Sequence, residues 1–256
     1  MNLEEEISLY SDKEAVIDIN HLKKAFDRHT VLKDISMKVK KSENVVVLGR
    51  SGIGKSVLIK CIVGLIHPDE GSVKVFGKEV TTMNSKELNE LRTKVGFIFQ
   101  SNALYDSMTV RENLEFPLRR NKELNDHHVI EGLIVEALEN VGLLDTINKM
   151  PSELSGGMKK RIGLARTLIL KPEIILYDEP TTGLDPLTSR EISNLILEIQ
   201  TKYNASSIII THDLNCAKIT SNRMLILQDG VFLAEGTFNE LKNSNNEWVR
   251  SYFKIE

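Results

Sequence analysis

The sequence lacks the features that mark membrane-spanning and secreted proteins. No run of 18 apolar residues occurs, which predicts that the chain does not cross a membrane. The acidic start, Met1–Glu6, has neither the basic nor the apolar region of a secretory signal. The two cysteines, Cys61 and Cys216, are far apart and form no C-x-x-C pair. We therefore expect a cytoplasmic protein in which Cys61, on the apolar face of a predicted helix, is a buried, reduced thiol.

The sequence also has no large excess of charge of either sign and no internal repeat. Its formal net charge is −3, whereas a general nucleic-acid binder shows a strong basic excess. We therefore expect no nucleic-acid partner. The 256 residues, 41% of them hydrophobic and 27% charged, are typical of a globular protein of one or two domains with a large core.

A glycine-rich segment, Gly49–Ser56, has the sequence Gly-Arg-Ser-Gly-Ile-Gly-Lys-Ser and matches the phosphate-binding P-loop pattern. It follows a short apolar run, Asn44–Leu48, that predicts a buried parallel strand. After it, the apolar residues Leu58, Cys61, Ile62 and Leu65 have the spacing of one helix face. Strand, glycine loop and helix thus occur in the order that the P-loop requires. In such a loop backbone N–H groups surround a phosphate at a helix N-terminus, Lys55 reaches the phosphates, and Ser56 ligates Mg²⁺.

Further apolar runs predict the rest of the fold. Residues 16–40 are expected to form antiparallel strands, and strands are also expected at 95–99, 174–177, 207–211 and 224–227. A helix with Ile192, Leu195, Ile196 and Ile199 on one face separates two of these strands, which predicts a parallel sheet covered on both sides. Between 101 and 160 the pattern is helical, with a capping box at Thr109 and Glu112 and an amphipathic stretch at 129–141.

Two acidic residues follow the strand at 174–177. The run Ile174–Glu179 resembles the Walker B motif, which implies that Asp178 lies at the magnesium site, directly or through a water, with Glu179 next to it. Adjacent residues of a strand point to opposite faces unless the chain turns, and Pro180 favours such a turn.

The segment Leu154–Met158, Leu-Ser-Gly-Gly-Met, resembles the signature motif of ABC transporter ATPases. With the P-loop and the Walker B-like residues 174–179, this resemblance covers about 15–240. It implies an α/β fold with a P-loop (RecA-like) parallel-sheet core, an N-terminal antiparallel β subdomain and an inserted α-helical subdomain. The core would take 15–100 and 161–245, the helical subdomain 101–160, a polar tail 1–14 and a C-terminal tail 246–256. That last tail docks on its own core or on a partner.

The resemblance also implies roles for individual residues. ATP would be held by the P-loop residues Gly49, Arg50, Ser51, Gly52, Ile53, Gly54, Lys55 and Ser56 of one chain and by Ser155, Gly156 and Gly157 of a second copy. Glu179 would be the general base, His212 of the switch loop would contact the γ-phosphate, and Asp185 of the D-loop would cross the dimer interface. Gln100 of the Q-loop would assist catalysis and, with Ser56 and Asp178, hold Mg²⁺. Phe26 either stacks on adenine or belongs to the core. The usual fifth signature residue is Gln, and here it is Met158.

The segment Phe97–Leu114 resembles more closely the ATPases of MCE-type (Mla-like) lipid transporters. This implies a subunit on the cytoplasmic face of the inner membrane, with a permease, an MCE-domain protein and in some systems a STAS-domain subunit as partners. Leu104, Tyr105 and Met108 either line the groove for the permease or pack within the helical subdomain. Two alternatives remain open: an importer ATPase for amino acids or metals, and a soluble ABC protein that acts as a binding module.

Overall fold

The computed structural model describes residues 15–27, 29–101, 104–119 and 126–254. Its strands form one ten-stranded sheet in the order β5-β4-β1-β2-β10-β9-β3-β8-β7-β6. The strands are β1 (Ala15–Phe26), β2 (His29–Lys40), β3 (Asn44–Leu48), β4 (Glu70–Val75), β5 (Lys78–Glu79), β6 (Val95–Ile98), β7 (Ile174–Asp178), β8 (Ser206–Thr211), β9 (Arg223–Gln228) and β10 (Val231–Gly236).

One half of the sheet is parallel and buried on both faces. Strands β9, β3, β8, β7 and β6 run parallel to their neighbours, as the apolar runs predicted. Alternate residues of a strand point to opposite faces. Accordingly Val46 and Leu48 of β3 join one hydrophobic cluster, while Val45 and Val47 join another on the opposite face.

The other half of the sheet is antiparallel. β1 pairs with β2 and with β4, which confirms the expected antiparallel strands between residues 16 and 40. β9 pairs with β10, also antiparallel. β10 connects the two halves because it also contacts β2, with Val231 opposite Asp34. The predicted mixed architecture, a parallel core with an antiparallel β subdomain, is therefore correct.

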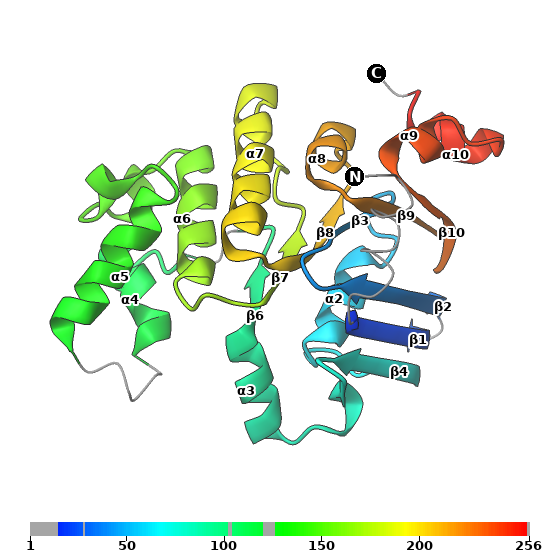
Figure 1. Ribbon diagram of the computed structural model, residues 1–256, viewed down its shortest axis with the longest axis horizontal. Helices are drawn as coiled ribbons and strands as arrows, with labels where there is room; N and C mark the ends of the chain where they lie inside the picture. Colours follow the sequence, from blue (N-terminus) through cyan, green and yellow to red (C-terminus); the bar gives the residue numbers. More distant parts are fainter. Residues whose placement is uncertain (1–14, 28, 102–103, 120–125, 255–256) are drawn as a thin grey trace, which may run out of the picture.

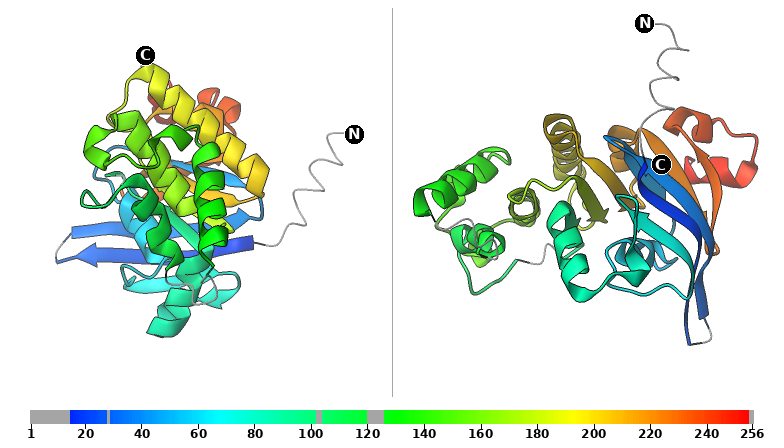
Figure 2. Two further views of the ribbon diagram at one scale, coloured as in Figure 1. Left: turned by 90° about the vertical axis from the view of Figure 1, so that its left-hand side faces the viewer. Right: turned by 60° about the horizontal axis from the view of Figure 1, so that its bottom comes forward.

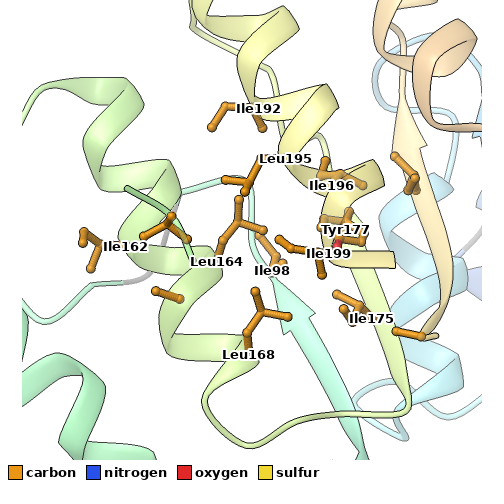
Figure 3. Packing of buried hydrophobic residues seen from close by; sticks show 14 of the residues in the cluster. Ile98, Ile162, Leu164, Leu168, Ile175, Tyr177, Ile192, Leu195, Ile196 and Ile199 are labelled. Atoms are coloured by element: carbon orange, nitrogen blue, oxygen red, sulfur yellow. The ribbon is translucent and has the colours of Figure 1, made fainter. Parts of the chain in front are cut away.

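Helices cover both faces of the parallel half (Figure 1). They are α2 (Lys55–Ile62), α3 (Ser85–Lys94), α4 (Val110–Leu118), α5 (His127–Glu139), α6 (Gly156–Leu168), α7 (Pro186–Tyr203), α8 (Leu214–Thr220), α9 (Phe238–Lys242) and α10 (Glu247–Tyr252), with 3-10 turns at Val80–Thr82, Leu144–Thr146 and Pro151–Glu153. Helices α2 and α3 pack on one face, and α4 to α10 contribute to the cluster on the other. Figure 3 shows the centre of that second layer, where residues of β6, β7, α6 and α7 converge, among them Ile98, Ile162, Leu164, Leu168, Ile175, Tyr177, Ile192, Leu195, Ile196 and Ile199.

The described part of the segment 101–160 contains helices and turns but no strand, as predicted, and lies at the opposite end of the molecule from β1 and β2 (Figure 2). The predicted boundary at 160/161 is wrong in one respect, because it cuts through α6, which runs without a break from Gly156 to Leu168. This helix belongs to both parts: it contacts α4 and α5 of the helical subdomain, and also β6 and α7 of the core.

The helix after the P-loop is shorter than its apolar spacing predicted. α2 ends at Ile62, and Leu65 is 51% exposed rather than on the buried face. Gly64 has φ +64°, its N–H donates to the carbonyl of Cys61, and the N–H of Leu65 donates to the carbonyl of Lys60. These two bonds form a Schellman motif, which ends a helix with a left-handed glycine.

The C-terminal segment packs on its own chain. Val249 of α10 is buried, and the rings of Phe253 and Phe238 meet edge to face with centroids 5.3 Å apart. Of the two alternatives for residues 246–256, docking on the core is therefore confirmed for the described part, which ends at Lys254. The polar tail 1–14 lies outside the described residues. Cys61 is buried, as predicted, and so is Cys216. Across the described ranges, no helix is both long and apolar enough to span a membrane.

Candidate nucleotide-binding site

The P-loop, residues 49–56, connects β3 to α2 as the sequence predicted. Gly54 stands at the N-cap of α2 with φ +110°, a backbone conformation that side chains disfavour. A Cβ built on Gly54 would lie 2.5 Å from Cγ1 of Val31 in β2, so space as well as conformation requires glycine there. The loop therefore brings the N-terminus of α2, with its unpaired N–H groups, to the carboxyl end of β3, where an anion is favoured.

Lys55 is held inside this loop with its side chain 4% exposed. Its Nζ donates to the carbonyl oxygens of Gly49 (2.6 Å) and Arg50 (3.0 Å) and lies 3.2 Å from Oε1 of Glu179. An ammonium has three donors, so these three contacts satisfy it. A phosphate that binds Lys55 must therefore replace Glu179 or a loop carbonyl.

Ser56 and Asp178 meet at the carboxyl end of β7. The Ser56 Oγ donates a hydrogen bond of 2.8 Å to Oδ1 of Asp178. Burial raises the pKa of Asp178, while the Ser56 bond opposes that rise. Two adjacent oxygen ligands of an octahedral Mg²⁺, each at about 2.05 Å, are ~2.9 Å apart. The observed spacing of a hydroxyl and a carboxylate therefore fits joint ligation of Mg²⁺.

Glu179 turns back toward the P-loop because its backbone adopts φ +52°, which is rare for a residue with a side chain. In a continuing strand it would point away from Asp178, but here its carboxylate reaches Lys55. Its Oε2 is bonded to Nδ1 of His212 (2.8 Å) and accepts from the hydroxyl of Thr182 (3.2 Å). The carboxylate is buried, and each of its oxygens is fixed by a polar partner.

His212 follows β8, and its half-exposed imidazole lies at the edge of the site. Asp213 fixes this loop: its Oδ1 accepts from the N–H groups of Asn215 and Cys216 at the start of α8, and its Oδ2 accepts from the hydroxyl of Thr181. The loop of His212 is thus tied to the turn that carries Glu179. We call Gly49–Ser56, Asp178, Glu179 and His212 the nucleotide cluster.

Ser155, Gly156, Gly157 and Asp185 form a second group, which we call the signature cluster. Ser155 is the N-cap of α6 and accepts from the N–H of Met158 at 3.2 Å, which leaves its own hydroxyl hydrogen free to donate. Asp185 caps α7 in the same way. A Cβ built on Gly157 would lie 2.6 Å from Cγ2 of Thr188, so close contact with α7 requires a glycine there. Two helix N-termini therefore lie side by side.

Within the described ranges, no hydrogen bond or ion pair joins the signature cluster to the nucleotide cluster. Each presents donors suited to an anion, and the two are carried by different parts of the fold. This separation is what a site shared between two chains requires.

The other predicted residues belong to neither cluster. Phe26 is exposed at the end of β1, with the ammonium of Lys24 5.3 Å from its ring centre, so it is not a core residue and is open to stacking. Gln100 is exposed just after β6, and its side chain has no bond within the described residues. Met158, in place of the usual Gln, is half-buried and packs against the core.

The segment after Gln100 is divided between the two predicted environments. Leu104 packs against the core of the helical subdomain, whereas the Tyr105 side chain is 43% exposed. The Tyr105 ring contacts Phe116, with centroids 4.8 Å apart, and lies 5.6 Å from the guanidinium carbon of Arg166. Tyr105 is thus a half-exposed aromatic residue with two ring contacts within its own chain.

Two residues of the site were missed by the sequence analysis. Thr182 donates a hydrogen bond to Glu179, and no sequence pattern other than the D-loop motif marks this threonine. Lys160 has one: it stands four residues before Leu164 and eight before Leu168, on the buried face of α6, where a lysine is unexpected.

Comparisons with known proteins show the family to which this chain belongs. A family model described as "ABC transporter" matches residues 32–182. The "Probable ribonucleotide transport ATP-binding protein mkl" of Mycobacterium tuberculosis (strain ATCC 25618 / H37Rv) is 38% identical over 92% of this chain. This chain spans 66% of that relative's length.

Two other relatives have different names. The "Protein TRIGALACTOSYLDIACYLGLYCEROL 3, chloroplastic" of Arabidopsis thaliana is 36% identical, with 96% of this chain and 76% of the relative covered. The "Methionine import ATP-binding protein MetN" of Campylobacter jejuni is 38% identical, with 88% and 72% covered.

Among solved structures, a dimeric post-hydrolysis state of the ATP-binding cassette MJ0796 bound to ADP and Pi matches with a TM-score of 0.80 and 29% identity. The match covers 87% of this chain and 98% of that one.

Proposed function

Because this chain belongs to the ABC transporter family as an ATPase of the ATP-binding-cassette type, we propose that it binds and hydrolyses ATP with Mg²⁺ to power lipid transport through a separate permease. The observation that carries the enzymatic part is the nucleotide cluster. Lys55 and Ser56 come from one segment and Asp178 and Glu179 from another, 122 residues later for the Ser56–Asp178 pair, and they meet within hydrogen-bonding distance.

In this proposal the P-loop amides and Lys55 bind the β- and γ-phosphates of ATP, and the phosphate takes the place of Glu179 at Lys55. Ser56 and Asp178 would hold Mg²⁺, with help from Gln100, and the ion would neutralise negative charge on the phosphates. Glu179, released from Lys55 but still fixed by His212, then accepts the proton of the attacking water. His212, at the edge of the same cluster, would contact the γ-phosphate.

We propose that two copies close around ATP, with the nucleotide cluster of one chain facing the signature cluster of the other. The unused hydroxyl of Ser155 and the amides of Gly156 and Gly157 would bind the γ-phosphate held by the partner. The dimeric relative MJ0796 supports this arrangement. To move closure from 1:99 to 99:1, ATP must favour the closed state by about 5.5 kcal/mol. Asp185, at the adjacent helix start, would lie at the interface.

Lipid as the cargo is supported by the segment Phe97–Leu114, which resembles MCE-type ATPases, and by the relative whose name refers to trigalactosyldiacylglycerol. The names of the mycobacterial and Campylobacter relatives refer to ribonucleotide and methionine. In the lipid system the chain would sit on the cytoplasmic face of the inner membrane, bound to a permease with an MCE-domain protein and possible STAS-domain partner. Phe26 would stack on the adenine.

The cargo is tested by purifying the full-length chain with its partners from its native membrane in mild detergent. Mass spectrometry should then identify a permease, an MCE-domain protein and bound phospholipid. A complex with an amino-acid-binding protein, retaining methionine, would replace the lipid assignment by the import alternative suggested by the Campylobacter relative.

The contact with the permease is tested at Tyr105. Tyr105→Asp places a charge on the exposed ring position and should release the permease, while ATP binding is retained. Leu144→Asp is the matched control, because Leu144 is similarly exposed on the helical subdomain but lies away from Gln100 in the sequence. Co-purification of the permease with Tyr105→Asp at the wild-type level would reject this contact.

A further inference from the structure

Helix α6 contains a buried lysine on its apolar face. Lys160 is only 6% exposed and shares the face of Leu164 and Leu168, which belong to the hydrophobic cluster beneath α7. Burial of a lysine is unfavourable unless its ammonium is paired, and a methionine or glutamine would fill this space at a lower cost. The presence of lysine therefore indicates that its ammonium makes a specific polar interaction.

The partner of Lys160 is the backbone of the Q-loop. Its Nζ donates a hydrogen bond of 2.6 Å to the carbonyl oxygen of Gln100, 60 residues earlier in the chain. Burial lowers the pKa of Lys160, whereas the fields of Asp178 and Glu179 raise it. The ammonium thus lies within the electrostatic influence of Asp178 and Glu179. A hydrogen bond to a charged group is stronger than a neutral one, so this contact fixes the peptide of Gln100 firmly.

The same helix begins at the signature cluster. Ser155 caps α6, and Lys160 follows five residues later, about 7.5 Å along the axis at 1.5 Å per residue. One continuous helix therefore carries at its start the donors for the partner's ATP and, one and a half turns on, the group that holds the Q-loop of its own site. α6 also contacts β6, the strand from which the Q-loop emerges.

We propose that Lys160 is a positioning residue that fixes Gln100 to helix α6, so that movement of the signature cluster is transmitted to the magnesium-facing side chain of Gln100. The proposal rests on the proposed roles of Gln100 and Ser155. When the signature cluster of one chain binds the ATP held by its partner, helix α6 would pass that change to Gln100 of the same chain. The two ATP sites of the dimer would then be coupled through this helix.

The test measures ATPase rate against Mg²⁺ concentration with the full-length chain. Lys160→Met keeps the apolar stem but removes the donor, and should raise the Mg²⁺ concentration for half-maximal rate by about tenfold. Lys160→Arg retains a charged donor, so its Mg²⁺ concentration for half-maximal rate should lie close to the wild-type value. Lys171→Met, which removes a half-exposed lysine just beyond the same helix, should match the wild type.

A purely structural role predicts a different result: a lower melting temperature and maximal rate with an unchanged Mg²⁺ requirement. That result in Lys160→Met would overturn the proposal. If Lys160→Met does not fold, Lys160→Gln, a smaller uncharged donor, is measured in the same way and is expected to show an intermediate Mg²⁺ requirement.

A double variant separates this proposal from the role of Gln100 itself. Lys160 bonds to the backbone of Gln100, so the bond survives in Gln100→Ala. If Lys160 acts through the Gln100 side chain, Lys160→Met should add nothing to the Mg²⁺ requirement of Gln100→Ala. Full additivity would overturn the positioning role. An unchanged Mg²⁺ requirement in Gln100→Ala alone would instead reject the proposed role of Gln100.

Discussion

Replacing Glu179 by glutamine removes one charge from the centre of the nucleotide cluster while it preserves the side-chain shape. The Glu179 carboxylate is 3.2 Å from Nζ of Lys55, a gross attraction of about 5 kcal/mol at an effective dielectric constant of about 20. Desolvation of the two buried charges offsets much of this attraction. ATP must displace this carboxylate from Lys55, and glutamine removes the competition. The variant should therefore bind ATP at least as tightly as the wild type, and up to about tenfold more tightly.

The same substitution removes the general base. Loss of such a group typically lowers the rate about 10²–10⁴-fold, which is roughly 2.7–5.4 kcal/mol in activation free energy. The assay combines phosphate release, binding of a fluorescent ATP analogue, and size-exclusion chromatography with ATP and Mg²⁺, where the variant should remain dimeric. Glu173→Gln is the control, because Glu173 precedes the same strand and pairs with Lys94 in solvent. Turnover within threefold of the wild type would refute the role of Glu179.

Two further predictions concern the P-loop and the edge strand β5. Gly54→Ala should abolish ATP binding and lower the melting temperature, because it forces a side chain into φ +110° against Val31; binding at the wild-type level would contradict this. Burial alone would raise the pKa of Glu79, but hydrogen bonds from Ser72, from the N–H of Val73 and from Thr81 lower it. A lowered folded-state pKa stabilises the protein above the unfolded pKa, and this stability is lost as pH falls through the folded value. Denaturant titrations should thus show a smaller loss of unfolding free energy on acidification for Glu79→Gln than for the wild type, and equal losses would reject this contribution.

The strand pattern and the motif order predicted most of the core, because both depend on local sequence. The buried run Asn44–Leu48 and the capping box at Thr109 are as expected. The end of α2 was not predicted, since the apolar spacing continues to Leu65 beyond the last helical residue. The helix ends at the left-handed conformation of Gly64, which the apolar pattern does not reveal. The boundary at 160/161 was misplaced because a helix that packs on two layers has no change of composition where the layers meet.

The sequence predicted which residues make up the site but not how their side chains pair with one another. The motifs identified Lys55 and Glu179, but the ion pair between them depends on the positive φ of Glu179, which the sequence only suggests through Pro180. The bond from Lys160 to Gln100 joins segments 60 residues apart, so no local pattern contains it. Contacts of this kind follow from the packing of α6, which tertiary structure alone determines.

If each ATP site is shared between two chains, as we propose, two variants that are inactive alone should restore activity to each other when mixed. Lys55→Ala removes the phosphate-binding lysine, and Ser155→Ala, combined with Gly157→Val, disables the signature cluster. In a sandwich dimer, a mixed dimer of the two keeps one intact site. Random mixing should therefore restore ATPase activity to roughly a quarter of the wild-type level. If the nucleotide and signature clusters of one chain serve the same ATP, no dimer has an intact site, and a mixture as inactive as its components would contradict the account.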